Sequence, residues 1–316
     1  MTGPEPEAVG LAARLADRSR PLRLFSLTPP RETTPVEDLD RVAALTVERI
    51  HGLDLDALVL YDIDDESDRN PAVERPFPYL PTLDPVVFHR EHLGDWRRPL
   101  VVYRCVGKYH ATDLGAWMRS ADVGQVMTVL VGSSSAGKAV LTGLDEAYTL
   151  RQRVRPQLPL GGVVIAERHE RRADEHLRML TKSGRGCSFF VSQIFYDLDC
   201  TKNLLSDYAY ACRDRGVAPV PVVLSTSVCG SARTLEFMTW LWISVPRWLR
   251  NAIVNADDPL AESFAHCLAG ARDMIAFCRR LGLPFGINVE SVSIRRVEIE
   301  ASVELAREIS GLLGRR

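Results

Sequence analysis

Long apolar runs are missing from this sequence, and so is the paired cysteine spacing of a small metal site. No run approaches the roughly 18 apolar residues that a membrane-spanning helix needs. The seven cysteines include no C-x-x-C pair, which argues against a structural zinc or a disulfide framework. We therefore expect reduced cysteines in a cytoplasmic protein that has no membrane partner and binds no metal.

An excess of charge of either sign is also absent. The formal net charge is −2, so no overall field would draw the protein to nucleic acid. Residues 1–9 are acidic and contain proline, without the basic-then-apolar order of a signal peptide. We expect no nucleic-acid partner, and a protein that stays in the cytoplasm. The length of 316 residues suits one large α/β barrel or two medium domains.

Short β-branched runs alternate with longer segments of helical periodicity, which indicates repeated βα units around a parallel sheet. Because no linker-like or repeated stretch interrupts the alternation, we predict a single α/β domain, a (β/α)₈ TIM barrel over residues 21–316. A flexible segment over residues 1–20 precedes it. A doubly wound open sheet is the alternative, because periodicity does not show closure. The predicted strands are residues 22–27, 57–61, 99–105, 126–131, 162–166, 189–195, 221–224 and 285–289.

In a TIM barrel the chemistry lies at the carboxyl ends of the strands, so the loops after them hold the candidate residues. Residues 132–139, GSSSAGKA, follow one strand and nearly form a phosphate-binding P-loop. Ala139 stands where that motif needs Ser or Thr to ligate magnesium. A Gly/Ser loop is therefore the simpler interpretation, although its backbone N–H groups could hold a phosphate or a carboxylate.

Acidic segments follow two other strands. Residues 62–69 lack the glycine and the final glutamate of a calcium loop, so we expect solvated charge that can also line the active face. Residues 167–170 and 174–176 place histidines beside carboxylates, which suits acid–base chemistry or a metal. The H-E-x-x-H spacing is absent, and acids at an early helix position are also favoured by the helix dipole.

Polar side chains end two apolar strands. Gln193 lies among aromatic residues, where an unpaired amide would cost about 1–3 kcal/mol. Its amide both donates and accepts, as the edge of a pterin requires, although a bond to strand backbone is the alternative. Asn288 and Glu290 end the last strand, and Glu290 is a candidate for proton transfer. The aromatic segment 240–248 is a packed helix corner, a cover for a flat substrate, or a contact in a homo-oligomer.

Residues 161–197 resemble the middle of the methylenetetrahydrofolate reductases. The run FVSQIFYD at 190–197 is similar to that family's T-Q-x-x-F/Y-D pattern, and an acidic residue and a lysine precede it on a predicted helix. Residues 25–30, 66–69 and 288–305 resemble the family's opening strand, its E-x-D-R loop and its closing N-R-x-E segment.

The resemblance implies a (β/α)₈ barrel that reduces 5,10-methylenetetrahydrofolate to 5-methyltetrahydrofolate, with electrons from NAD(P)H and usually through bound FAD. Tetrahydrofolate would then be the substrate, and the resemblance implies that Gln193, Tyr196 and Arg296 bind it. Glu175 and Lys182 would face a flavin. Together with residues at other strand ends, the cofactor-binding candidates are Tyr61, Gly132, Ser133, His169, Glu175 and Lys182.

Three positions depart from the family pattern. Ser26 stands where the family's glutamate donates a proton, and a serine has no pKa suited to that task. Residues 131–133, VGS, replace the flavin-site R-G-D, and Val102 replaces a histidine that touches flavin. We therefore consider Glu290, Glu167 and Ser26 as catalytic candidates. Three functions remain open: a divergent reductase that uses NAD(P)H with or without FAD, a folate-dependent group transfer, and a non-catalytic folate-binding barrel.

Overall fold

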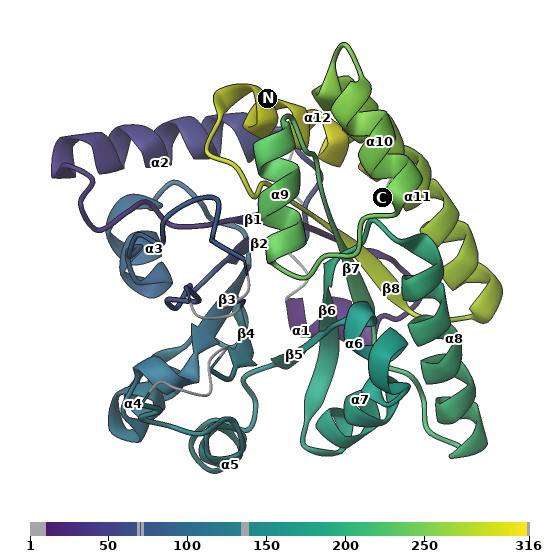
Figure 1. The fold of residues 1–316 in the computed structure, drawn as a ribbon. Coiled ribbons are helices and arrows are strands. Elements are labelled where there is room, and N and C mark those ends of the chain that lie inside the picture. The colour runs from purple at the N-terminus through teal and green to yellow at the C-terminus, as the bar shows by residue number, and fades with distance from the viewer. Residues whose placement is uncertain (1–10, 68–69, 71–72, 134–138, 315–316) are drawn as a thin grey trace, which may run out of the picture.

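A closed parallel barrel forms the centre of the molecule (Figure 1). The computed structural model describes residues 11–67, 70, 73–133 and 139–314. Within them eight parallel strands pair in chain order, which confirms the predicted (β/α)₈ barrel. The strands are β1 Leu22–Leu27, β2 Ala57–Leu60, β3 Leu100–Cys105, β4 Val126–Val131, β5 Leu160–Val164, β6 Cys187–Ile194, β7 Val222–Ser227 and β8 Phe285–Glu290.

Helices cover the outside of the barrel, and α9 stands between the α2–α3 side and the α10–α11 side of the molecule (Figure 1). No helix in the described parts of the chain combines the length and the apolar character that crossing a membrane requires. The helices are α1 Leu11–Ala16, α2 Val36–His51, α3 Pro85–His92, the 3₁₀ turn η1 Val106–Lys108, α4 Ala111–Ser120, α5 Leu144–Val154, α6 Ala166–Arg172, α7 Glu175–Gly184, α8 Leu198–Asp214, α9 Ala232–Trp240, α10 Arg247–Asn255, α11 Pro259–Leu281 and α12 Arg296–Leu313.

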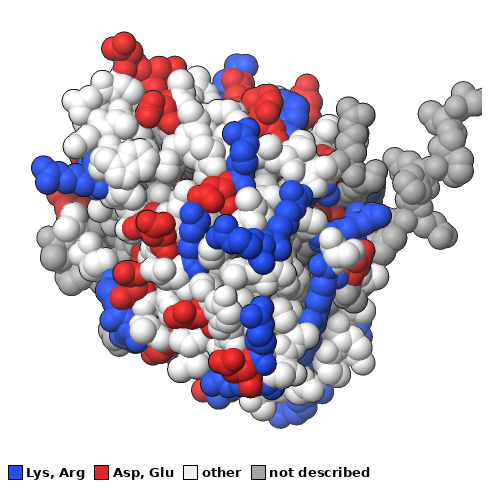
Figure 2. All heavy atoms as spheres, turned by 90° about the vertical axis from the view of Figure 1, so that its right-hand side faces the viewer, with Lys and Arg blue, Asp and Glu red and all other residues white. Residues whose placement is uncertain are grey.

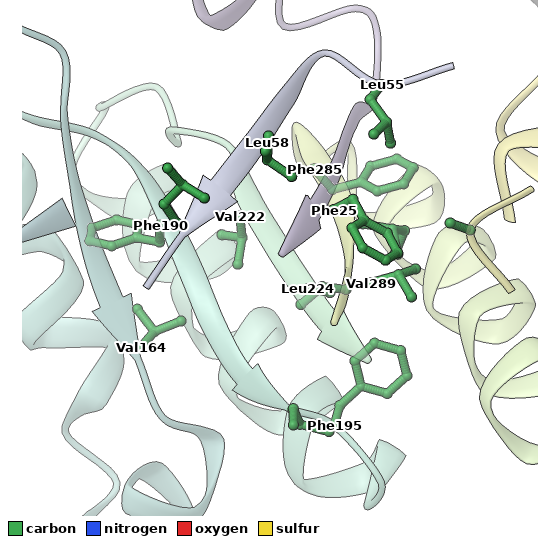
Figure 3. Packing of buried hydrophobic residues seen from close by; sticks show 14 of the residues in the cluster. Phe25, Leu55, Leu58, Val164, Phe190, Phe195, Val222, Leu224, Phe285 and Val289 are labelled. Atoms are coloured by element: carbon green, nitrogen blue, oxygen red, sulfur yellow. The ribbon is translucent and has the colours of Figure 1, made fainter. Parts of the chain in front are cut away.

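Alternate residues of each strand face two separate apolar layers. One layer packs between the strands and the helices, and Figure 3 shows Phe25, Leu58, Val222, Leu224 and Val289 among its members. The other layer fills the barrel interior, with buried side chains from β1 to β4, β6 and β7. Strands that are buried on both faces read as nearly continuous apolar runs, which is why the sequence pattern located them.

The interior is packed tightly around the ring of Phe189. A Cβ atom added at Gly161 would lie only 2.4 Å from that ring, so glycine on β5 leaves the room that the phenyl group occupies. Phe189 is fully buried. The interior of this barrel is therefore a filled core in its amino-terminal half rather than a channel.

Helix α1 closes the amino-terminal end of the barrel. Leu15 is buried in the interior cluster, and the Arg14 guanidinium lies 3.3 Å from the carboxylate of Asp56, just before β2. Residues 11–20, predicted from the sequence to be part of a flexible segment, thus contribute to the base of the barrel. Residues 1–10 of that segment lie outside the described residues.

The long helix α11 shows how local chemistry sets the helix ends. The Asp258 side chain accepts hydrogen bonds from the backbone N–H groups of Leu260 and Ala261, and Pro259 occupies the first helical position. Gly282 ends the helix in the left-handed conformation, with φ of 67°.

The surface on the α10–α11 side of the molecule carries charges of both signs. Figure 2 shows this face, where Lys and Arg side chains are interspersed with Asp and Glu.

Candidate functional site

The carboxyl-terminal half of the barrel interior is polar, in contrast to the apolar half below it. We call this end the mouth and define it by Ser26, Tyr61, Gln193, Ser225, Asn288 and Glu290. These residues come from β1, β6, β7 and β8 and from the first position after β2. The loops that follow the strands meet at this end, so the mouth is where a TIM barrel places its chemistry.

Asn288 is the centre of a hydrogen-bonded chain at the bottom of the mouth. The Ser26 hydroxyl donates to Asn288 Oδ1 over 2.7 Å. Asn288 Nδ2 donates to Ser225 Oγ over 3.1 Å and to Tyr61 Oη over 3.4 Å. The chain connects β1, β7 and β8 through fully buried groups, so it fixes the floor on which the outer residues stand.

Glu290 lies above this floor, beside two tyrosines. The Tyr61 hydroxyl donates a hydrogen bond to its carboxylate, and the Tyr61 and Tyr103 rings meet edge to face with centroids 4.7 Å apart. Burial raises the pKa of Glu290 from 4.5 to about 7, although the Tyr61 hydrogen bond favours the ionised form. Near neutral pH this carboxyl group can therefore donate or accept a proton.

Gln193 is held by residues 241–244, the first part of the link between α9 and α10, which we call the strap. Gln193 Nε2 donates to the Leu241 carbonyl oxygen over 3.0 Å. The backbone N–H of Ser244 donates to Glu167 Oε1 over 3.0 Å, and the Ser244 hydroxyl donates to Asp197 Oδ2 over 3.1 Å. The strap thus spans the carboxyl ends of β5 and β6, and it orients the amide of Gln193.

Glu167 forms a second protonatable carboxyl group near the mouth. Burial raises its pKa, and the neighbouring carboxylate of Asp197 acts in the same direction. Its Oε2 atom is buried and has no hydrogen-bond partner among the described residues. A buried carboxylate oxygen without a partner is costly, so this group is poised to take a proton or a ligand donor.

A cluster of aromatic rings, which we call the aromatic wall, lies between α9 and the loop after β2. Arg75, in the loop after β2, lies over the rings of Tyr79, Phe237 and Trp240 at 5.8, 5.3 and 5.1 Å from their centroids. Trp240 Nε1 donates to the carbonyl oxygen of Val73 over 3.2 Å, which joins α9 to this loop. Arg75 Nε and Nη1 are buried without hydrogen-bond partners among the described residues.

The two residues implied to face a flavin are occupied inside the protein. Glu175 is fully buried and pairs with Arg168 at 3.0 Å and with Arg178 at 3.3 Å. Lys182 Nζ donates to the carbonyl oxygen of Val163, and burial lowers the pKa of this lysine. Both residues belong to α7, on the outside of the barrel wall.

Three other predicted site residues do not join the mouth. Tyr196 is buried outside the barrel wall and donates to the Ser227 carbonyl oxygen over 2.7 Å. Arg296 opens α12 with an exposed side chain that pairs with Glu300 over 2.6 Å. His169 is buried on α6 and bonds to Asp207 on α8 over 3.0 Å.

The predicted strand-end loops have mixed outcomes. Gly132 follows β4 directly, and a Cβ atom there would meet the Leu144 side chain at 3.7 Å. Ser133 also follows β4, whereas residues 134–138 of the P-loop-like run lie outside the described residues. The acidic segment that starts at Asp62 was expected to be solvated, but Asp62 is buried and accepts a hydrogen bond from Lys108 over 2.7 Å.

A hollow lies at the other end of the barrel. It has a volume of about 650 Å³ and is lined by arginines, among them Arg18, Arg20, Arg23 and Arg279. Two of these side chains bond to the protein's own backbone: Arg18 to the Pro219 carbonyl oxygen and Arg23 to that of Gly314. This hollow is remote from the carboxyl ends of the strands, so we assign the chemistry to the mouth.

Arg75 and Tyr79 are two site residues that the sequence analysis missed. They belong to the run RPFPYLP at 75–81, whose prolines and aromatic residues mark an ordered loop rather than a solvated one. Tyr103 was missed as well, because a tyrosine inside an apolar strand reads as core. Its inward direction follows from the two-residue alternation along β3.

Comparisons with known proteins place this geometry in context. No protein-family model matches the chain, and a search of curated proteins finds no match. Among solved structures, a protein from Clostridium thermocellum that binds two copies of 5-methyl-5,6,7,8-tetrahydrofolic acid is 38% identical. The similarity covers 95% of this chain and 99% of that chain, with a TM-score of 0.84. EDTA monooxygenase from Chelativorans is 10% identical over 93% of this chain and 94% of its own, with a TM-score of 0.51, and shares the fold alone.

Proposed function

This chain belongs to the same protein family as the Clostridium thermocellum barrel, and we propose that it binds a reduced folate such as 5-methyltetrahydrofolate at its mouth. We further propose that Glu290 moves a proton in one-carbon chemistry on that folate. The observation that carries this function is the Glu290–Tyr61 pair, a carboxyl group with a pKa of about 7 at the carboxyl end of β8.

The mouth offers complementary groups for each part of a folate. Gln193 Oε1 makes no hydrogen bond among the described residues, so it is available to accept from the amino group of a pterin. The partly exposed rings of Tyr79 and Phe237 in the aromatic wall suit a flat heteroaromatic ring, and buried Trp240 supports them. The Arg75 guanidinium in that wall supplies the charge that a glutamyl carboxylate requires.

The reaction that we propose is the reduction of 5,10-methylenetetrahydrofolate to 5-methyltetrahydrofolate. Glu290 would donate its proton to N10 of the folate while the bond between N10 and the methylene carbon breaks. A reduced nicotinamide would supply hydride to that carbon, which becomes the methyl group. Ser26 would not serve as the acid, because its hydroxyl is engaged with Asn288 and has no suitable pKa.

The residues present do not fit a flavin in the way that the resemblance implies. Glu175 is enclosed by Arg168 and Arg178, and Lys182 bonds to the Val163 carbonyl oxygen, so neither is available to ribityl or phosphate groups. Val102, at the position of the family's flavin-contacting histidine, packs in the layer between strands and helices. We therefore derive no step through FAD.

A folate-dependent transfer without reduction, or simple folate binding, is the alternative function. The same engagement of Glu175 and Lys182 favours it, because these residues are the ones that would have held a redox cofactor. In a transfer reaction Glu290 would protonate or deprotonate a folate nitrogen without any hydride donor. The mouth residues are common to both functions, so binding and reduction need separate measurements.

Calorimetric titration with 5-methyltetrahydrofolate is the first test. We expect saturable binding by wild-type protein, and about tenfold weaker binding by Gln193→Ala, which loses one hydrogen-bonding amide. Arg296→Ala is the matched control, because its side chain is exposed outside the mouth. Absence of binding, or equal affinity of Gln193→Ala and wild type, contradicts the proposed site.

Oxidation of NADPH or NADH in the presence of 5,10-methylenetetrahydrofolate then separates the two functions. Consumption of one nicotinamide per 5-methyltetrahydrofolate formed supports the reductase. Folate binding without nicotinamide consumption, by protein with and without added FAD, rejects the reductase and leaves transfer or binding. The absorbance spectrum of the purified protein is recorded beforehand, because a flavin would be visible there.

A further inference from the structure

Two histidines and an aspartate from three different helices meet on the outer layer of the barrel. His169 belongs to α6, His176 to α7 and Asp207 to α8. Each residue offers one ligand atom, and these atoms lie within 4.8 Å of one another. His169 is two positions beyond Glu167 on α6, so its side chain leaves the helix on nearly the opposite side from the mouth.

The hydrogen bonding of this cluster is incomplete. His169 Nε2 lies 3.0 Å from Asp207 Oδ2, and the two imidazole rings stand perpendicular with centroids 5.2 Å apart. The Nδ1 atoms of both histidines are buried and have no hydrogen-bond partner among the described residues. Buried ring nitrogens are normally paired, so these two atoms call for a group that the protein does not supply.

The link between α6 and α7 holds the histidines in this position. Ala173 adopts the left-handed conformation with φ of 53°, and its backbone N–H donates to the His169 carbonyl oxygen. Residues other than glycine rarely adopt this conformation, so contacts with the surrounding structure must stabilise the turn. Asp174 follows directly, and its Oδ1 atom is also buried without a partner in the described part of the chain.

We propose that His169, His176 and Asp207 bind a divalent transition-metal ion, with Zn²⁺ as the best match. Two imidazoles and one carboxylate are ligands that zinc prefers over magnesium or calcium, which take oxygen donors. A water molecule would complete a tetrahedral set. The positive charge of Arg215 near His176 would repel a metal ion. The two nearby carboxylates of Asp174 and Asp207 carry more negative charge than Arg215 carries positive charge.

Metal binding requires a small closure of the cluster. Zinc bonds of about 2.0–2.1 Å place tetrahedral ligand atoms roughly 3.4 Å apart. His169 Nε2 and Asp207 Oδ2 are already 3.0 Å apart, whereas an atom pair at the 4.8 Å limit of the cluster must close by about 1.4 Å. His176 is half-buried, and the side chain of Asp207 is 53% exposed, so both can rotate. Because the ligands come from three helices, the ion would tie α6 and α7 to α8 and hold Glu167 indirectly.

Titration of the tag-free, chelator-treated protein with Co²⁺ and Zn²⁺ tests the site. We expect one Co²⁺ per chain with visible absorbance of a four-coordinate ion, displacement by Zn²⁺, and a rise in melting temperature of a few degrees. His176→Gln should lose the absorbance, and Asp207→Asn should weaken binding at least tenfold. His51→Gln, an exposed histidine at the end of α2, is the matched control and should bind as wild type does.

Two results would overturn the assignment. One is a wild-type protein that takes up less than one equivalent of Co²⁺ or Zn²⁺ at micromolar concentrations. The other is stoichiometric uptake that His176→Gln leaves unchanged, since the ion would then be held elsewhere. Circular dichroism of each variant verifies that the fold is retained. None of these measurements uses folate, so the outcome is independent of the function proposed for the mouth.

Discussion

The two ends of the barrel interior are built from the same strands but filled with different chemistry. At the amino-terminal end Leu22, Val101 and Phe189 are buried among other apolar side chains, and Leu15 of α1 covers them. At the mouth Ser26, Asn288 and other polar groups take the corresponding inward positions and bond to one another. The inward direction is the same at both ends, so only residue type distinguishes them.

The comparison shows how one fold separates stability from function. Apolar burial at the base contributes the hydrophobic stabilisation of the barrel, at about 25 cal/mol per Å² of buried apolar surface. At the mouth, interior positions are occupied by polar groups such as Glu290. The raised pKa of Glu290 shows that burial of its charged form is unfavourable. Substitutions at the two ends should therefore affect different quantities, which the following predictions test.

The largest effect on stability is expected at the base. Phe189→Ala removes a fully buried ring and leaves a cavity beside Gly161, so the free energy of unfolding should fall by about 3–5 kcal/mol. Ser225→Ala at the mouth is the matched substitution and should cost about 1 kcal/mol. Denaturant unfolding of both variants measures the difference. Equal losses would mean that the two ends contribute alike to stability.

The largest effect on activity is expected at the mouth. Glu290→Gln keeps the side-chain shape but removes the proton, so turnover in the folate reaction should fall by about 100-fold or more, with folate affinity little changed. Ser26→Ala is the control and should retain turnover within a few fold, because the Ser26 hydroxyl bonds to Asn288 and Tyr61 and has no pKa suited to proton donation. If Glu290→Gln retained wild-type turnover, Glu290 would not be the proton donor, and Glu167 would be the next residue to test.

Two arginines sharpen the comparison between the mouth and the outer surface. Arg75→Met retains most of the side-chain volume but removes the charge, and it should weaken binding of 5-methyltetrahydrofolate by about tenfold. Arg296→Met should leave the affinity unchanged, because Arg296 pairs with Glu300 in solvent. Calorimetry measures both variants. Similar affinities for the two would remove Arg75 from the folate site.

The last prediction concerns the pH dependence of stability. The pKa of Glu290 rises from 4.5 to about 7 on folding, so the folded chain holds a proton that the unfolded chain releases. This contribution is fully present below the unfolded pKa and is lost as pH rises through about 7. Glu290→Gln should abolish that loss, so the stability of the variant should not fall as pH rises through about 7. Identical pH profiles of unfolding for both proteins would contradict the raised pKa.

The strand pattern was predictable because barrel strands are buried on both faces. The predicted strands over residues 22–27 and 126–131 match β1 and β4. The strand predicted over residues 162–166 actually begins two residues earlier, at Leu160. The prediction missed this start because glycine has low strand propensity. Glycines stand at 161 and 162 because the rings of Phe189 and Phe190 leave little room for a side chain there. Helix α6 then starts at Ala166, inside the predicted strand.

Short helices and charged helix positions were harder to interpret. Helices α3 and α6 have fewer than three turns, which gives periodicity little length to act on. Glu175 and Lys182 matched a family pattern, but a sequence does not tell whether a charged group faces a ligand or its own chain. The structure pairs Glu175 with Arg168 and Arg178 instead.

The sequence by itself determined the alternating βα repeat, the polar residues at the strand ends and the candidacy of Glu290 and Gln193, because these follow from periodicity and residue type. Only the tertiary structure decided that Tyr61 meets Glu290, that Arg75 reaches the wall formed by α9, and that His169 and His176 join Asp207. Those groups are far apart along the chain. Their distances depend on barrel closure and helix packing, which no local pattern records.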